Sequence, residues 1–207
     1  MAEMSLYHVF TKSIAGYKVF KNKGDYRRMA ETIWYYTYER ETKFSKVVDF
    51  KKENKGRPVV RIICYCIMPT HLHLVLEEKM EKGIPKFMSN ILNSYTRYFN
   101  LKYNRKGHLW ESNYKKVMVE TDEQLLHLTR YIHLNPFTAG IVKKPENWEF
   151  SSYKEYLNCE KISLRICYFE DLIEISPENY RKFVEDYADY ERQLQMIKNL
   201  IKFENLS

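Results

Sequence analysis

The sequence of 207 residues has no apolar run long enough to cross a membrane. Its longest apolar stretch of note extends from Ile62 to Pro69, whereas a membrane-spanning helix needs about 20 apolar residues. The segment from Met1 to Met4 lacks the basic region and the apolar region that together make an export signal. We therefore expect a protein without membrane contact that stays in the cytoplasm.

Cysteine is scarce as well, and no two cysteines form a CxxC pair. The four are Cys64, Cys66, Cys159 and Cys167. Free cysteine is among the most buried residue types, so Cys64 and Cys66, two apart in an apolar run, are predicted to be core thiols. A disulfide framework is not expected in a cytoplasmic protein.

Length and composition indicate one core domain with one appendage, because domains commonly contain about 100–200 residues. Hydrophobic residues make up 44% of the chain, which is enough for a core. Charged residues make up 29%, which is typical of soluble globular proteins. The sequence has no internal repeat and no low-complexity segment.

The net charge of +7 gathers in one part of the chain. Seven Lys or Arg residues and one acid, Glu111, lie between Lys86 and Lys116. The aromatic residues interleaved with them are Tyr95, Tyr98, Phe99, Tyr103, Trp110 and Tyr114. This mixture suits a phosphate backbone and stacked bases, but it is equally typical of a solvated helix face with a hydrophobic back. The candidate nucleic-acid contacts are Arg97, Lys102, Arg105, Lys115 and Lys116.

The spacing of apolar residues predicts the order of strands and helices. Strands are expected at Leu6–Ile14, Val59–Ile67, His71–Glu77 and Tyr114–Glu120. Helices are expected at Asp25–Arg40, from Gly83 to a loop that begins near Asn104, and from Thr121 to about His133, before Pro136. The β-α-β-β-α-β-α order predicts an α+β fold, a ferredoxin-like α/β sandwich with a mainly antiparallel sheet.

The character of the sequence changes after Tyr156. A heptad-like apolar stripe follows, at Phe183, Tyr187, Tyr190, Leu194, Ile197 and Ile201. The stripe predicts an amphipathic helix packed on the core, with a contact in a homodimer as the alternative. We therefore divide the chain into a domain at residues 1–157 and a C-terminal helical extension at residues 158–207.

Two histidines, His71 and His73, are the first candidates for chemistry. Residues two apart on a strand point to the same face, so both imidazoles can bind one metal ion. Structural or surface histidines are the alternative, because an HxH pattern alone is common.

The HxH pattern lies in one of four segments that resemble the single-tyrosine HUH transposases, and most closely the REP-associated tyrosine transposases. The segments are CIMPTHLHLVL (Cys66 to Leu76), RYFNLKYNRKGHLWESNYK (Arg97 to Lys115), RYIHLNPFTAGIV (Arg130 to Val142) and WEFSSY (Trp148 to Tyr153). They follow the order of the family at compatible spacing. Four ordered motifs form a specific signal, whereas any one of them does not.

The resemblance implies that His71 and His73 bind a divalent metal, that Tyr131 attacks DNA and that Asn135 is a further metal ligand. Residues i and i+4 share a helix face, so Tyr131 and Asn135 can approach one metal. Asn135 precedes Pro136, however, and a residue before proline is pushed away from α geometry. A departure of its side chain from the ideal helical direction is therefore an open alternative.

Only the resemblance selects Tyr131 among the 18 tyrosines. On the residues alone, Tyr95, Tyr98 and Tyr114 are equal candidates for a nucleophile. His133, between Tyr131 and Asn135, is expected to face elsewhere on the helix, as a structural or DNA-contacting residue.

The implied activity is that of a metal-dependent endonuclease and transposase. Such an enzyme cleaves and rejoins single-stranded or hairpin DNA through a 5′-phosphotyrosine intermediate. Imidazole with carboxamide ligands suits Mg²⁺ or Mn²⁺, and imidazole alone would also suit Zn²⁺. One alternative is a domesticated protein that binds single-stranded or hairpin nucleic acid without catalysis. Another is a metal-dependent phosphodiesterase that uses water as its nucleophile.

Overall fold

A computed structural model describes residues 5–49, 52, 56–111, 114–159, 162, 164–188 and 190. Strands β1 (Leu6–Lys12), β2 (Val60–Met68), β3 (His71–Glu78) and β4 (Lys115–Val119) form one sheet in the order β2-β3-β1-β4. Every neighbouring pair is antiparallel. The predicted ferredoxin-like α+β fold is confirmed.

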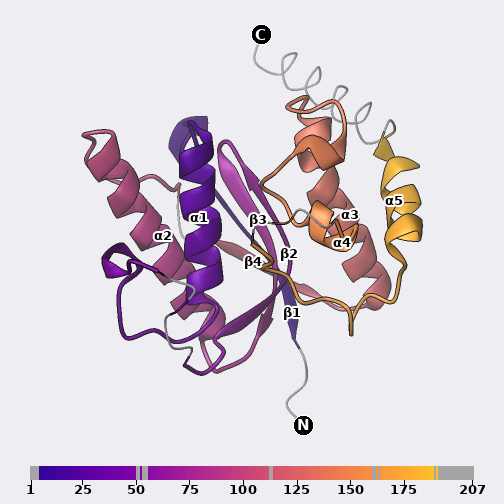
Figure 1. Ribbon diagram of the computed structural model, residues 1–207, viewed down its shortest axis with the longest axis horizontal. Helices are drawn as coiled ribbons and strands as arrows, with labels where there is room; N and C mark the ends of the chain where they lie inside the picture. The colour runs from indigo at the N-terminus through magenta and orange to yellow at the C-terminus, as the bar shows by residue number, and fades with distance from the viewer. Residues whose placement is uncertain are drawn as a thin grey trace.

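Helices cover both faces of the sheet (Figure 1). Helices α1 (Lys23–Tyr36) and α2 (Gly83–Lys102) pack against each other on one face. Helix α3 (Asp122–Thr138) lies on the other face, with the short α4 (Tyr153–Tyr156) and α5 (Pro177–Glu185) beside it. No helix in the described ranges is long and apolar enough to span a membrane.

The period-two alternation of β3 divides its side chains between the two helical layers. Leu72, Leu74 and Leu76 are buried in the hydrophobic core. His71 and His73 point to the opposite face, where His73 meets an aromatic ring of α3. The predicted core position of Cys64 and Cys66 is also confirmed, since both thiols are free and buried.

Helix α1 ends at Tyr36, four residues before the predicted end at Arg40. The carbonyl of Thr37 accepts hydrogen bonds from the N–H groups of Val59 and Val60. These bonds draw the chain into pairing with the segment that leads into β2, so the helix stops. The predicted C-terminal bound was wrong because a long-range backbone contact overrides the local apolar spacing.

Helix α3 continues through Pro136 to Thr138, so the prediction that it ends before Pro136 was wrong. Proline removes one backbone donor and is strongly disfavoured in a helix interior, but this one lies in the last turn. The helix beyond it is held by the bond from Ala139 N–H to the Asn135 carbonyl. The Pro136 carbonyl in turn accepts the Ile141 N–H.

The two edges of the sheet differ in their cover. Backbone bonds to β2 come from the later chain, with Ile67 N–H donating to Phe150 and Tyr168 N–H donating to Ile62. Strand β4 is the other edge, where Val117 and Met118 are exposed. The uncovered part of the sheet is therefore beside β1 and β4.

Part of the predicted C-terminal extension packs on the core as a helix. Tyr180 and Val184 of α5 are fully buried, and α5 contacts α3. The later members of the apolar stripe, Leu194, Ile197 and Ile201, lie outside the described residues. The division of the chain at residue 157 and the dimer contact stay predictions.

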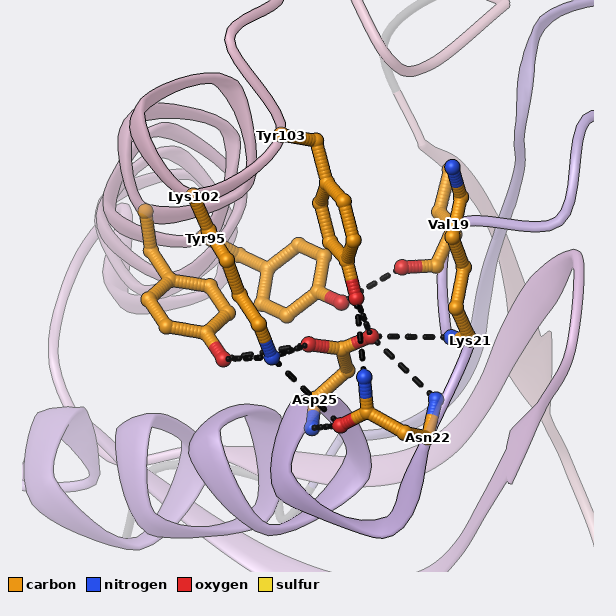
Figure 2. Close-up of polar contacts among 8 residues, drawn as sticks. Val19, Lys21, Asn22, Asp25, Tyr95, Lys102 and Tyr103 are labelled. Carbon is orange, nitrogen blue, oxygen red and sulfur yellow. Dashed lines mark hydrogen bonds and ion pairs between the residues drawn. The ribbon is translucent and has the colours of Figure 1, made fainter.

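A buried carboxylate, Asp25, joins α1 to the end of α2 (Figure 2). It completes the capping box at the N-terminus of α1, where it accepts the Asn22 N–H. Its Oδ1 lies 2.6 Å from Lys102 Nζ, and its Oδ2 accepts a 2.7 Å hydrogen bond from the Tyr103 hydroxyl. Burial alone would raise the pKa of Asp25, but hydrogen bonds led by Lys102 and Tyr103 outweigh it and lower that pKa.

We expect Asp25→Asn to lower the free energy of unfolding at pH 7 by about 2–4 kcal/mol, because the buried charge that pairs with Lys102 is lost. The folded-state pKa of Asp25 is depressed, so its stabilisation is present above the unfolded-state pKa and disappears as the pH falls through the folded-state value. Urea unfolding from pH 7 to acid should show the two proteins converging. Exposed Asp186→Asn is the matched control and should change little; a constant gap at all pH values would contradict the assignment.

Candidate active site

The two histidines of the HxH pattern lie side by side on β3. Their ring centroids are 5.0 Å apart, with an interplanar angle of 87°. His73 is 7% exposed and His71 is half-buried. The Thr70 hydroxyl lies 3.0 Å from His71 Nδ1. The strand therefore presents two imidazoles to one small region, as predicted.

Helix α3 brings Tyr131 and Asn135 over this pair. The ring of Tyr131 meets that of His73 edge-on, with centroids 5.8 Å apart. The side chain of Asn135 lies near His71 and raises the pKa of its imidazole. Tyr131 is 46% exposed, so this residue is accessible to a substrate. Because Asn135 is inside α3, the alternative that Pro136 turns its side chain away does not hold.

A buried network fixes the opposite side of α3. His133 is fully buried, with Nδ1 2.7 Å from the Tyr180 hydroxyl and Nε2 2.8 Å from Ser152 Oγ. Its Nε2 also lies 3.3 Å from Cys64 Sγ on β2. Burial lowers the pKa of His133 to about 3, so the imidazole is neutral. Of the two roles predicted for His133, the structure gives the structural one.

The imidazoles of the site are neutral at physiological pH. Burial is the main cause for both, and it lowers the pKa of His71 to about 4. For His73 the neighbouring His71, His8 and Lys12 add to the effect of burial, and its pKa lies well below the ordinary value. A neutral imidazole keeps a lone pair for a metal, so this state suits a ligand.

Three residues of β1 complete the site, and the sequence did not identify them. The register sets Phe10 opposite His73 and Lys12 opposite His71. His8, on the same face, places Nε2 3.0 Å from His73 Nδ1. The alternation of His8, Phe10 and Lys12 can be read from the sequence. No local pattern, however, indicates that their strand pairs with the strand of the HxH pattern.

The predicted nucleic-acid contacts are dispersed by the fold. Lys115 stands opposite Phe10, so cross-strand pairing puts it on the face of the histidines. Lys116 is opposite Val9 and lies over the Tyr7 ring at 4.0 Å, on the other face. Arg97 is exposed on α2.

Lys102 and Arg105 have structural partners. Lys102 pairs with the buried Asp25. Arg105 donates to the carbonyls of Gly107 and His108 and so braces the loop after α2. These contacts favour a role in folding for both residues.

Most of the aromatic residues interleaved with the basic ones are also internal. Tyr95 and Phe99 are fully buried, and the Tyr98 and Tyr103 hydroxyls bond to Asp25. Of the six, the two that line an open groove are Trp110 and Tyr114. This groove, of about 830 Å³, lies between α2 and β4 and includes Ser89, Asn93, Thr96, His108 and Lys116.

The donor atoms fit a divalent cation, since imidazole nitrogens suit Zn²⁺ and similar metals and an amide oxygen suits Mg²⁺ or Mn²⁺. Two neutral imidazoles and one carboxamide converge at His71, His73 and Asn135. Among the residues that the structure describes, no group of three or more His, Cys, Asp or Glu side chains could hold a metal. A cation here would therefore depend on the amide oxygen of Asn135 and on oxygen atoms of substrate or water.

Comparison with known proteins places this arrangement in context. Residues 5–135 match the family described as transposase IS200 like. A protein of Haemophilus influenzae, described as a candidate REP-associated tyrosine transposase, is 24% identical over 109 residues. The match covers 47% of this chain and 61% of the relative, so the chain spans less than two thirds of the length of that relative.

A solved structure shows the same fold. A REP-associated tyrosine transposase bound to a REP hairpin superposes with a TM-score of 0.53 at 15% identity, over 86% of this chain and 96% of that one. A transposase-like crystal structure from Deinococcus radiodurans has a TM-score of 0.40 at 14% identity, over 64% and 91% of the two chains, which is too low to support an argument.

Proposed function

Because this chain belongs to the IS200-like transposase family, we propose that it cleaves and rejoins single-stranded DNA through a covalent link to Tyr131. The observation that carries the proposal is the meeting of four side chains from two elements. His71 and His73 come from β3, and Tyr131 and Asn135 from α3. An exposed tyrosine beside a pair of neutral imidazoles is suited to phosphoryl transfer.

The reaction we propose needs a nucleophile, a leaving group and control of charge. Tyr131 Oη attacks the scissile phosphorus, and the bond to the 3′ oxygen breaks. A 5′-phosphotyrosine link and a free 3′-OH result. The link conserves the phosphodiester energy, so a 3′-OH can reverse the step and join strands without an external energy source.

A divalent cation held by His71, His73 and Asn135 would polarise the scissile phosphate and offset the charge on its oxygens. Burial keeps both imidazoles neutral and ready to ligate. Asn135 is near His71, so its amide lies in the same region. Thr70 steadies the ring of His71 through its Nδ1.

The substrate we propose is single-stranded DNA that carries a hairpin. A solved relative of the same fold is bound to a REP hairpin. On this chain, Lys12 and Lys115 add positive charge to the histidine face, where β4 leaves the sheet open. Unpaired bases could stack on Trp110 and Tyr114 in the groove between α2 and β4, on the other side of the β4 edge.

We expect Tyr131→Phe to eliminate the covalent adduct and to lower cleavage by at least about 10³-fold, because the ring stays and the attacking oxygen is lost. Labelled hairpin DNA with Mg²⁺ or Mn²⁺, followed by a denaturing gel, measures both. Tyr168→Phe is the matched control, since Tyr168 is 50% exposed and Tyr131 46%.

If the adduct persists in Tyr131→Phe, another residue is the nucleophile, and Tyr114 is the first to check. Product without adduct in the wild type would indicate a water nucleophile, and binding without product a non-catalytic binder.

We expect cleavage to require a divalent metal, and His71→Gln/His73→Gln to lose both cleavage and Mn²⁺ binding. Glutamine is chosen because His73 is buried and alanine would leave a cavity. Isothermal titration with Mn²⁺ and thermal unfolding without metal separate ligation from folding. Full activity in EDTA, or a folded double variant that cleaves normally, would refute the metal assignment.

We expect hairpin DNA to bind more tightly than blunt duplex, with affinity that falls as salt rises. Lys12→Gln and Lys115→Gln should each reduce the slope of log affinity against log salt by about 0.7, the value for one phosphate contact on a single strand. Fluorescence anisotropy over a salt series measures the slope. Lys182→Gln on α5 is the control. If the slope is unchanged in all three variants, the surface beside β1 and β4 does not bind DNA.

A further inference from the structure

We propose that His8 is a positioning residue that orients His73 toward the metal. This inference rests on the proposed function, and it assigns a role to a residue outside the HxH pattern. His8 lies on β1, and its Nε2 is 3.0 Å from His73 Nδ1. The other ring nitrogen of His73, Nε2, is thereby left as its metal ligand.

The geometry is that of a hydrogen bond between the edges of two rings. The ring planes differ by 18°, and the centroids are 5.3 Å apart while the two nitrogens are 3.0 Å apart. The rings therefore meet edge to edge, and the contact lies near both ring planes. An N–H and a lone pair of imidazole both lie in that plane, so the two nitrogens point at each other.

This alignment separates an orienting partner from a second ligand. Two nitrogens that ligate one metal direct their lone pairs at a third point, whereas those of His8 and His73 face one another. The described residues also contain no group of three His, Cys, Asp or Glu side chains that could hold a metal. His8 therefore acts through His73.

The proton count follows from the hydrogen bond. Neutral imidazole carries one N–H, and His73 must keep the lone pair of Nε2 for the metal. The proton of His73 is then on Nδ1 and is donated to His8 Nε2, so that His8 carries its own proton on Nδ1. Metal-ligating histidines commonly donate their second nitrogen in this way, and the partner fixes both tautomer and ring orientation.

The same strand restrains the ring of His73 a second time. Phe10 is stacked against His73 with centroids 5.9 Å apart, and the rings of Phe10 and His8 are 4.9 Å apart. Because Phe10 is the direct cross-strand partner of His73, the β1–β3 register sets both contacts. His71 has different partners, Thr70 and Asn135. Each imidazole is thus oriented by its own neighbours.

The test uses the full chain and two readouts. In the metal-free protein, long-range ¹H–¹⁵N NMR reports the tautomer of His73. We expect the Nδ1–H form in the wild type and a mixture in His8→Ala. Titration with Co²⁺, followed by calorimetry and visible absorption, should show affinity reduced about 10–100-fold in His8→Ala. His8→Gln should restore most of it, because a glutamine oxygen can accept the Nδ1–H.

Exposed His108→Ala is the matched control and should bind Co²⁺ like the wild type. Thermal unfolding without metal shows whether each variant is folded, and His8→Gln keeps the test decisive if His8→Ala is not. If the wild type binds Co²⁺ and His8→Ala binds it with the same affinity, the positioning role alone is overturned. An Nε2–H tautomer of His73 in the wild type has the same consequence. A change in the Co²⁺ absorption spectrum that signals loss of a nitrogen ligand would make His8 a ligand and also overturn it. No Co²⁺ binding by the wild type overturns the metal part of the proposed function together with this inference, whereas the Tyr131 adduct is scored separately.

Discussion

The antiparallel register between β1 and β3 sets Phe10 opposite His73 and Lys12 opposite His71. Residues directly opposite in such a pair lie on the same face, so one register brings a charge, an aromatic ring and a third imidazole to the HxH pair. A slip of one residue would turn the leucines of β3 toward α3 and the histidines toward α1 and α2. The site is therefore as well defined as the hydrophobic core that enforces the register.

Helix α3 is held in place by the face that carries His133, which is not the face of Tyr131 and Asn135. His133 is fully buried and bonded to Tyr180, Ser152 and Cys64, which come from three other parts of the chain. A satisfied network of this kind fixes the rotation of the helix. Tyr131 and Asn135, two residues to either side, then point to the sheet. The C-terminal segment thus contributes to the site indirectly, through the Tyr180 hydroxyl.

The basic and aromatic segment between Lys86 and Lys116 serves two purposes. Its buried members, such as Tyr95 and Phe99, build the core between α2 and the sheet, and Lys102 neutralises Asp25. The part near β4, with Trp110, Tyr114 and Lys116, lines an open groove. The composition of the segment does not separate buried residues from groove-lining residues, because neighbouring residues on a helix or strand point to different sides. The positive charge beside the histidines comes instead from Lys12 and Lys115.

Local pattern determined most of the secondary structure and the shared face of the two histidines. Period-two alternation in β3 needs no partner to put His71 and His73 on one side, and the order of strands and helices was enough for the fold class. The ends of α1 and α3 were missed. Pairing of Thr37 with Val59, and the continuation of α3 through Pro136, depend on contacts distant in sequence or on packing that outweighs a local preference.

Only the tertiary structure decides that β1, β3 and α3 meet at the candidate site. The resemblance named Tyr131 and Asn135, and the structure brings them to the histidines, while their chemical roles stay predictions. His8, by contrast, is an ordinary strand residue until β1 pairs with β3. Sequence determines which side chains share a face, because that follows from backbone geometry one residue at a time. Tertiary structure decides which faces meet, because strand pairing and helix rotation are set by burial summed over the whole core.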